Sequence, residues 1–255
     1  MKNHTRPRYY IFSLDRGLSV LEAFARANEP LSLSKAAELT NMNLPTAIRY
    51  IRTLKDLGYL IADDTVKRYS LTSKILSLGF SYLNNMDFRA RLNPYLMSLS
   101  RNFDVNANLA ILDNIDILFV DRIKSTTITQ LNHTIGSKFP AYCTSLGKAI
   151  MAFLDPIAIN KIIENTAFTA FTPYTLTDKN KLIKELEKVK KQGYAEAHQQ
   201  ISLGWSNYAA PIFRLNKIEG AIGTSFPHSM LRSDKNKVKQ MLNRLLAISR
   251  EASII

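Results

Sequence analysis

Residues 31–71 read LSLSKAAELTNMNLPTAIRYIRTLKDLGYLIADDTVKRYSL, and this stretch decides the fold of the N-terminal part. Apolar residues recur at helical spacing over residues 32–40 and again over residues 44–57, which predicts two consecutive helices. Two short runs, residues 59–62 and 68–71, are separated by a polar turn and predict a hairpin. Helix, turn, helix and hairpin in this order are typical of a winged helix-turn-helix, whose second helix enters the major groove of DNA.

The residues at the turns and helix ends of this stretch also fit a winged helix-turn-helix. Asn41 tolerates the positive φ that a tight turn between the helices needs, and Ala37 is small where the two helices cross. Asn43 is a favourable N-cap for the second helix, and Pro45 is accepted in its first turn because an N–H group there has no intrahelical partner. Gly58 is expected to end that helix.

The second helix divides into an apolar and a polar side. Its inward stripe is expected to comprise Met42, Ala47, Tyr50 or Ile51, and Leu54. We expect the DNA-facing residues to come from the beginning and outer side of this helix, the helix before it and the hairpin: Lys35, Asn43, Leu44, Pro45, Thr46, Arg49, Arg52, Thr53, Lys67 and Arg68.

These residue types bind different parts of DNA. Arginine can pair with guanine through two hydrogen bonds and threonine can contact base edges, whereas the lysines and the hairpin arginine more often bind phosphate. For each single residue, a solvated helix surface is the alternative interpretation, and Arg49 could support the fold as well as contact DNA.

Helices are also predicted on both sides of the deciding stretch. Residues 13–27 show helical spacing and are stopped by the sequence Asn-Glu-Pro at residues 28–30. After the hairpin, Ser73 is expected to cap a further helix over residues 74–83. A domain boundary is expected at residues 84–85.

The remainder of the chain predicts helices interleaved with strands. We expect helices over residues 88–103, 144–154, 155–165, 178–192 and 233–252. We expect strands over residues 107–112, 117–123, 126–131, 194–197, 208–213 and 221–226. Hairpin-like spacing between the late strands favours an α+β fold with an antiparallel or mixed sheet and helices packed against it.

Composition limits the class of protein. The chain has 255 residues, 46% of them hydrophobic, which is enough for one or two domains with real cores. A net charge of +13 favours a polyanionic partner, either nucleic acid or an anionic membrane. No run approaches the ~18 apolar residues of a membrane helix or resembles a signal peptide, so we expect a cytoplasmic protein that binds nucleic acid. One cysteine, Cys143, excludes an intrachain disulfide.

Several segments in order along the chain resemble IclR-family transcriptional regulators. They are SLDRGLSVL (residues 13–21), LSLSKAA (31–37), TAIRY (46–50), TLKDLGYL (53–60), RYSLT (68–72), FPAYCTSLGKA (139–149), GYA (193–195), LG (203–204) and AAPI (209–212). The resemblance implies an α+β protein with an N-terminal winged helix-turn-helix and a C-terminal GAF-like domain, whose mostly antiparallel sheet is flanked by helices. It also implies a homodimer or dimer of dimers, with repression or activation controlled by a small-molecule effector.

The resemblance also suggests three parts of the chain and a branch of the family. The parts are a DNA-binding domain in residues 8–72, a linker helix in residues 73–86, and an effector-binding and oligomerisation domain in residues 87–255. The chain looks similar to the branch that governs aromatic-acid catabolism through protocatechuate or 4-hydroxybenzoate. The sequence departs from that branch at Ile48, at the pair Gln199 and Gln200, and at Trp-Ser-Asn in residues 205–207. These departures leave the operator sequence and the identity of the ligand open.

By position, the resemblance implies an effector pocket lined by Tyr142, Thr144, Ser145, Leu146, Trp205, Asn207, Gly223 and Ser225. Free N–H groups at a helix start favour a carboxylate. Asn207 and Ser225 could orient a small polar ligand, while Trp205 or Tyr142 could pack against an aromatic ring. In the alternative interpretation, Ser145 is only a helix cap and Trp205 is ordinary core.

Two other functions compete with a ligand-controlled regulator. An enzyme that processes a small acid could use Cys143 with His198 or His133, although a lone cysteine is more often a small buried hydrophobe. Lys148 is followed by Ala149, which does not fit a phosphate-binding loop, and no metal-ligand spacing occurs. We therefore expect no catalytic residues, metal or cofactor. A DNA-binding module without ligand sensing is the second alternative.

Overall fold

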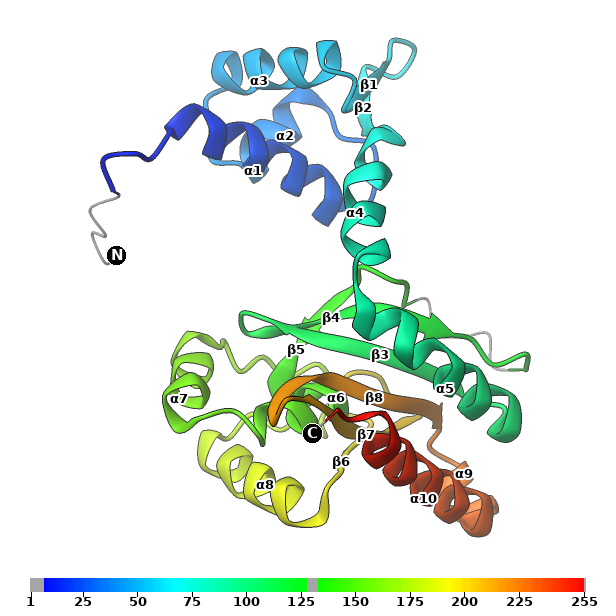
Figure 1. The fold of residues 1–255 in the computed structure, drawn as a ribbon. Helices are drawn as coiled ribbons and strands as arrows, with labels where there is room; N and C mark the ends of the chain where they lie inside the picture. The colour runs from blue at the N-terminus through cyan, green and yellow to red at the C-terminus, as the bar shows by residue number, and fades with distance from the viewer. Residues whose placement is uncertain (1–6, 128–132, 255) are drawn as a thin grey trace. The chain divides into compact units, whose positions relative to one another are not determined.

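The computed structural model describes residues 7–127 and 133–254. The chain divides into two compact units, residues 1–85 and 86–255 (Figure 1). Each unit has its own hydrophobic core. The helix that follows the hairpin belongs to the first unit. Its separation as a linker in residues 73–86, between domains in residues 8–72 and 87–255, stays a prediction.

The first unit has the predicted order of helices and strands. Its elements are α1 (Phe12–Ala27), α2 (Leu33–Leu39), α3 (Leu44–Asp56), β1 (Leu60–Asp63), β2 (Arg68–Leu71) and α4 (Lys74–Asn84). The side chain of Ser32 accepts a hydrogen bond from the amide of Lys35 at the start of α2, and Asn43 accepts from the amide of Thr46 at the start of α3. Asn41 has a φ of +52° in the turn between these helices, as its residue type predicted.

The core of the first unit is built on the inward stripe of α3. Ala47, Ile51 and Leu54 are buried at i, i+4 and i+7. Ile51 and Leu54 share one core cluster with Val20 and Phe24 of α1. Between the two predicted alternatives Tyr50 and Ile51, the fully buried residue is Ile51, while Tyr50 is partly buried. This packing fixes which side of α3 remains at the surface.

The hairpin and α4 follow directly. β1 pairs with β2 in antiparallel register, and the Asp63 carboxylate caps the turn by accepting from the amides of Thr65 and Val66. The expected cap at Ser73 is wrong. Ser73 already has helical φ and ψ angles and makes no capping hydrogen bond, because the hydroxyl of Thr72 accepts from the amide of Lys74 instead.

The second unit is built around a six-stranded antiparallel sheet. Its strands are β3 (Asn106–Asp113), β4 (Asp116–Ile123), β5 (Lys138–Pro140), β6 (Ala195–His198), β7 (Trp205–Arg214) and β8 (Lys217–Pro227), in the spatial order β5-β4-β3-β8-β7-β6. This confirms the α+β prediction. β5 was not predicted. In the expected strand over residues 126–131, Thr126 and Thr127 form a bend and residues 128–131 lie outside the described residues.

Helices cover both faces of this sheet (Figure 1). They are α5 (Asp87–Phe103), the 3₁₀-helix η1 (Ala141–Cys143), α6 (Ser145–Met151), α7 (Pro156–Asn165), α8 (Lys179–Gln192), α9 (Met230–Ser233) and α10 (Lys235–Ala252). Side chains alternate between the faces along β8. Gly220 and Gly223 therefore belong to opposite faces, and a Cβ atom would meet Phe88 of α5 at Gly220 but Leu146 of α6 at Gly223. Thus α5 and α6 pack on opposite faces.

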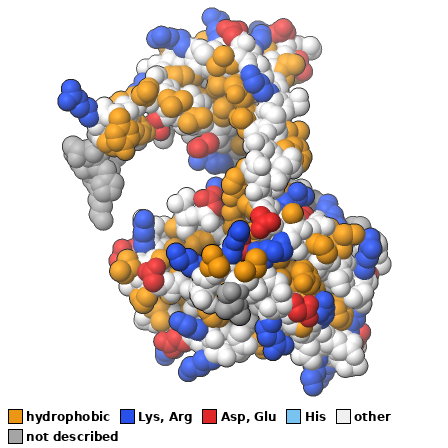
Figure 2. Space-filling view, viewed as in Figure 1, with side chains coloured by type: hydrophobic (Ala, Val, Ile, Leu, Met, Phe, Trp, Pro, Cys, Tyr) orange, Lys and Arg blue, Asp and Glu red, His pale blue; other side chains and the backbone are white. Residues whose placement is uncertain are grey.

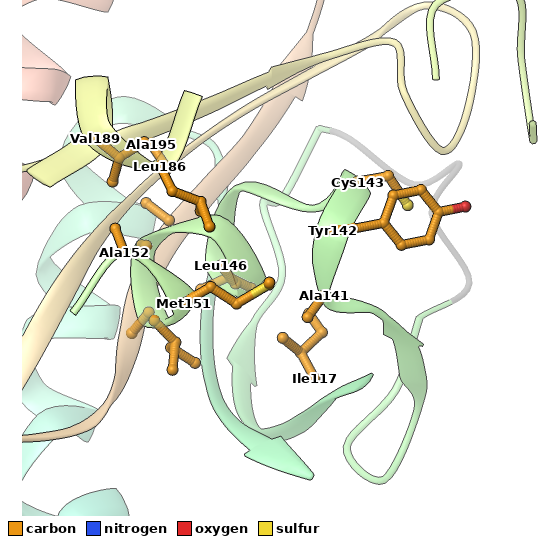
Figure 3. Packing of buried hydrophobic residues seen from close by; sticks show 14 of the residues in the cluster. Ile117, Ala141, Tyr142, Cys143, Leu146, Met151, Ala152, Leu186, Val189 and Ala195 are labelled. Carbon is orange, nitrogen blue, oxygen red and sulfur yellow. The ribbon is translucent and has the colours of Figure 1, made fainter. Parts of the chain in front are cut away.

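Two helices differ from the sequence expectation. The helix expected over residues 233–252 is interrupted at Asp234, whose side chain caps α10 by accepting from the amide of Lys237. The helix expected over residues 144–154 is only α6, which packs tightly against η1. Figure 3 shows Leu146 and Met151 of α6 among the buried residues that include Ala141 of η1.

Candidate functional sites

The outer side of α3 presents two unpaired arginines. Arg49 and Arg52 are exposed, and within the described residues their guanidinium groups make no hydrogen bond or ion pair. Thr53 is exposed next to them and donates its hydroxyl hydrogen bond to the carbonyl oxygen of Arg49 (2.9 Å), while Thr46 is partly buried. Since residues three and four apart share a helix face, these side chains form one surface opposite the buried stripe.

The beginning of α3 is also at the surface. Asn43, Leu44 and Pro45 are exposed, with 42% of Leu44 accessible to solvent. The Oδ1 atom of Asn43 is engaged with the amide of Thr46 (2.9 Å), so its amide nitrogen is the group left for an outside partner. An exposed apolar residue beside free polar groups suits contact with base edges and thymine methyl groups.

The three other predicted basic residues lie on α2 and the hairpin. Lys67 is exposed and lies in the hairpin turn with a φ of +52°. Lys35 forms an ion pair with Glu38 (2.7 Å), and Arg68 donates to the carbonyl oxygen of Pro30 (3.4 Å). Both are exposed, so phosphate could compete for them. Figure 2 shows Lys and Arg side chains along the outer edge of the first unit.

A pocket in the second unit gathers most of the predicted effector residues. Its cavity volume is about 50 Å³, more than the ~10–15 Å³ that one water molecule needs. Seven of the eight predicted residues line it: Thr144, Ser145, Leu146, Trp205, Asn207, Gly223 and Ser225. Sequence reasoning missed nine further lining residues: Asn108, Ile117, Phe119, His133, Phe139, Cys143, Ile201, Ser202 and Thr224.

Tyr142 is the predicted residue that this pocket does not include. It belongs to η1 and is 1% exposed, its hydroxyl donates to the carbonyl oxygen of Thr169, and its ring packs on Phe168 with centroids 4.8 Å apart. Figure 3 shows the ring turned away from Leu146. The turn of η1 thus directs Tyr142 into the core and its neighbour Cys143 to the pocket.

The start of α6 leaves two donors free at the pocket. Thr144 is the N-cap, and its hydroxyl accepts from the amide of Gly147 (3.0 Å). The amides of Ser145 and Leu146 have no acceptor within residues 7–127 and 133–254. The alternative that Ser145 is only a cap is therefore wrong, because Thr144 has that role. Ser145 is 3% exposed and lines the pocket.

The pocket lining carries no formal charge. Apolar side chains from Ile117, Phe119 and Phe139 form a large part of its wall, and no Lys, Arg, Asp or Glu lines it. Burial, and then the nearby charge of Arg122, lower the pKa of His133, so this ring is neutral at pH 7. A bound anion would thus be stabilised by N–H and hydroxyl groups and not by a cation.

The proposed catalytic pair lacks the required chemistry. Burial raises the pKa of the Cys143 thiol to about 12, so at pH 7 it is not a thiolate, and it donates weakly to the carbonyl oxygen of Pro140. The ring of His198 contacts Ser206 (3.0 Å) and Glu196 (3.3 Å) instead. Among the described residues, no three His, Cys, Asp or Glu side chains gather as a metal site would require. No described helix has the length and apolar character to cross a membrane.

Two family profiles match almost the whole chain. The profile of the IclR helix-turn-helix domain matches residues 13–64, and that of the bacterial transcriptional regulator IclR C-terminal domain matches residues 80–254. The first match includes α3 and all of β1, and the second includes every residue of the pocket. The pocket and the recognition helix therefore lie inside matched domains, whereas Lys67 and Arg68 lie between the two matched ranges.

Individual relatives are also similar. The Pca regulon regulatory protein of Pseudomonas putida is 31% identical over 80% of this chain and 70% of its own length. A transcriptional regulator from Rhodococcus sp. RHA1 has a crystal structure with a TM-score of 0.79 and 29% identity, covering 95% of this chain and 97% of that one. An IclR homolog from Microbacterium hydrocarbonoxydans, crystallised with 4-hydroxybenzoate, shares the fold with a TM-score of 0.78 at 19% identity, covering 94% and 98% of the two chains.

Proposed function

Because this chain belongs to the IclR family of bacterial transcriptional regulators, we propose that a small aromatic carboxylate, bound in the pocket of the second unit, controls its binding to operator DNA. The observation that carries this proposal is the pocket itself, where free amides of Ser145 and Leu146 adjoin apolar walls. The chain is a regulator and not an enzyme, as the names of its relatives indicate. The proposal places it in the cytoplasm, where bacterial operators are.

The chemistry of the pocket supports a monocarboxylate with a ring. Two free N–H groups can each donate to a carboxylate oxygen, and charge-assisted hydrogen bonds of this kind are about twice as strong as neutral ones. Phe119, Phe139 and Trp205 offer aromatic surface for a ring. The relative crystallised with 4-hydroxybenzoate and the Pca regulon relative support the same class of ligand.

We propose that α3 reads the operator while neighbouring basic residues hold phosphate. Base edges are assigned to the residues on the outer side of α3, which are Thr46, Arg49, Arg52 and Thr53. The exposed residues at the beginning of α3 are assigned to base edges as well, and they are Asn43, Leu44 and Pro45. Lys35, Lys67 and Arg68 are assigned to phosphate, which fixes position without reading sequence. Two copies of the chain would present two recognition helices to one operator.

The dimer is proposed to form through α4. Although α4 is an apolar helix, more than half of the surface of four of its large side chains is exposed. They are Leu76 (58%), Leu78 (59%), Phe80 (52%) and Tyr82 (55%). Such a surface on a single chain is typical of an interface. The effector would then shift an equilibrium between dimer arrangements that space the two α3 helices differently, which requires different effector affinities for the two arrangements.

Replacing Leu76 and Leu78 together with glutamate should dissociate the dimer and weaken operator binding at least tenfold. Burying a leucine side chain contributes about 1.5–3 kcal/mol, and both charges would have to be desolvated at the interface. Sedimentation velocity and fluorescence anisotropy with operator DNA measure the two effects. Leu215→Glu, at an exposed leucine outside α4, is the matched control. Wild-type operator affinity in the double variant would rule out α4 as the interface.

The proposed function is tested by titrating the purified protein with the DNA upstream of its own gene, across a salt series. Titrations with 4-hydroxybenzoate, with protocatechuate and without either should differ in operator affinity. We expect tight, salt-sensitive and sequence-selective binding, because phosphate contacts release counterions. Selective binding that neither acid changes would favour a DNA-binding module without this sensing function.

A further inference from the structure

We propose that Asn108 selects effectors that carry a hydrogen-bond donor, such as a hydroxyl group, in addition to the carboxylate. This inference rests on the proposed function and names the ligand class of the same pocket more narrowly. Asn108 lies in β3 and lines the pocket, and neither the sequence patterns nor the family resemblance pointed to it.

The side chain of Asn108 is buried, and only one of its two polar atoms has hydrogen-bond partners. It is 2% exposed, and its Nδ2 atom donates to Ser225 Oγ (3.1 Å) and to the carbonyl oxygen of Asn106 (3.4 Å). A carbonyl oxygen can only accept, so Nδ2 must be the atom that faces it. Oδ1 therefore faces elsewhere, and within the described residues it has no hydrogen-bond partner.

Strand register places the side chain of Asn108 on the pocket side of the sheet. Asn108 is opposite Gly223, and Asn207 is opposite Ser225. Directly opposed residues of antiparallel strands project to the same face, which is the face that α6 covers through Leu146. The Asn108 side chain thus lines the same cavity as the start of α6, where two N–H donors are free.

A buried acceptor without a partner makes the pocket selective. Oδ1 is buried and unpaired, so a ligand group that donates to it satisfies an acceptor that a group without a donor leaves unpaired. A hydroxyl or amino group can donate to Oδ1, whereas a second carboxylate, a keto group or fluorine cannot. Sites that hydrogen-bond a hydroxyl strongly reject analogues that lack it, because their own polar groups are then left unpaired.

The complementary ligand is consequently a hydroxylated or aminated monocarboxylate. Its carboxylate would accept from the amides of Ser145 and Leu146, and its donor would bind Asn108 Oδ1. A dicarboxylate fits poorly for two reasons. The lining has no cation for a second negative charge, and Oδ1 would repel it.

Calorimetric titration with matched probes tests this inference. The probes are 4-hydroxybenzoate and 4-fluorobenzoate, which have similar size but differ in the donor, together with 4-aminobenzoate as a second donor. We expect the wild-type protein to bind 4-hydroxybenzoate and 4-aminobenzoate at least tenfold more tightly than 4-fluorobenzoate. Asn108→Leu and Asn108→Ala should remove this preference, since both lack the acceptor. Asn108→Asp should keep it, since it retains the acceptor.

Asn102→Leu on the exposed surface of α5 is the control and should leave all three affinities unchanged. Circular dichroism of each variant confirms folding, and the alanine variant decides if the leucine variant does not fold. Equal wild-type affinity for the fluoro and hydroxy probes would overturn the role of Asn108 while leaving the proposed function intact. Failure of all three probes to bind would overturn both the effector class and this inference, and the operator titration would still report DNA binding separately.

Discussion

A protein in which Arg49 and Arg52 are both replaced by alanine is expected to lose selective operator binding, with its affinity falling to that for unrelated DNA. The two guanidinium groups are exposed and unpaired among the described residues, so their removal should leave the fold intact. A bidentate arginine–guanine pair contributes about 1–3 kcal/mol of discrimination. In the proposed dimer each substitution would act twice, which predicts a loss of at least a hundredfold.

Fluorescence anisotropy with operator and scrambled DNA at one salt concentration measures this loss. The matched control is Arg26→Ala with Lys55→Ala, which removes two exposed positive charges from the same unit but none from the assigned surface. The control should weaken binding to both DNAs equally. If the arginine variant retained its preference for operator over scrambled DNA, α3 would not be reading the sequence through these residues.

Gly147→Ala is expected to disrupt the effector pocket and to lower the free energy of unfolding by about 3 kcal/mol, the upper end of the usual cost of overpacking. An added Cβ atom would lie 2.2 Å from the carbonyl oxygen and 2.4 Å from the Cα of Ala141. Both are backbone atoms, so η1 and α6 would have to separate. Their separation would move Cys143, Thr144 and Leu146, which line the pocket.

Chemical denaturation followed by circular dichroism measures this loss, and the fluorescence of Trp205, the one tryptophan of the chain, reports on the pocket. Gly79→Ala in α4 is the matched control, because nothing lies within 4 Å of the Cβ that it adds. It should leave stability unchanged or slightly raised. Wild-type stability and effector binding in Gly147→Ala would show that the contact between α6 and η1 does not shape the pocket.

Local signals explain why the first unit could be predicted in detail. Asn43 caps α3 and Asn41 adopts a positive φ because each residue type favours that conformation in its own segment. Ser73 shows the limit of such reasoning. A serine before a helix predicts a cap, but Thr72 is held by the carbonyl oxygen of Gly58 (2.6 Å) and takes that role. That contact depends on tertiary structure.

The second unit was predicted in outline and less well in its short elements. β5 has only three residues, too few for an alternating pattern, and it forms because Pro140, Phe139 and Lys138 pair with β4. The last helix begins at Lys235 and not at Ser233, because the side chain of Asp234 caps it. Strand order and the division of helices between the two faces arise from packing that no single segment encodes.

For the pocket, the family resemblance predicted by position most of the residues that the fold brings together. It did not predict the direction in which each side chain points. Tyr142 was expected in the pocket and points into the core, because a 3₁₀-helix rotates successive side chains differently from an α-helix. Asn108 carried one usable signal, a polar residue within an apolar strand. Its unpaired Oδ1 could not be foreseen, because it depends on the register between β3 and β8.

The central claim is that the effector pocket and the recognition helix are energetically coupled, and one calorimetric comparison tests it directly. 4-Hydroxybenzoate is titrated into the protein alone and into the protein saturated with operator DNA. Because coupling between two binding sites is reciprocal, the two dissociation constants should differ by the same factor by which the acid changes operator affinity, at least about fivefold. Binding with the same dissociation constant in both titrations would contradict the claim.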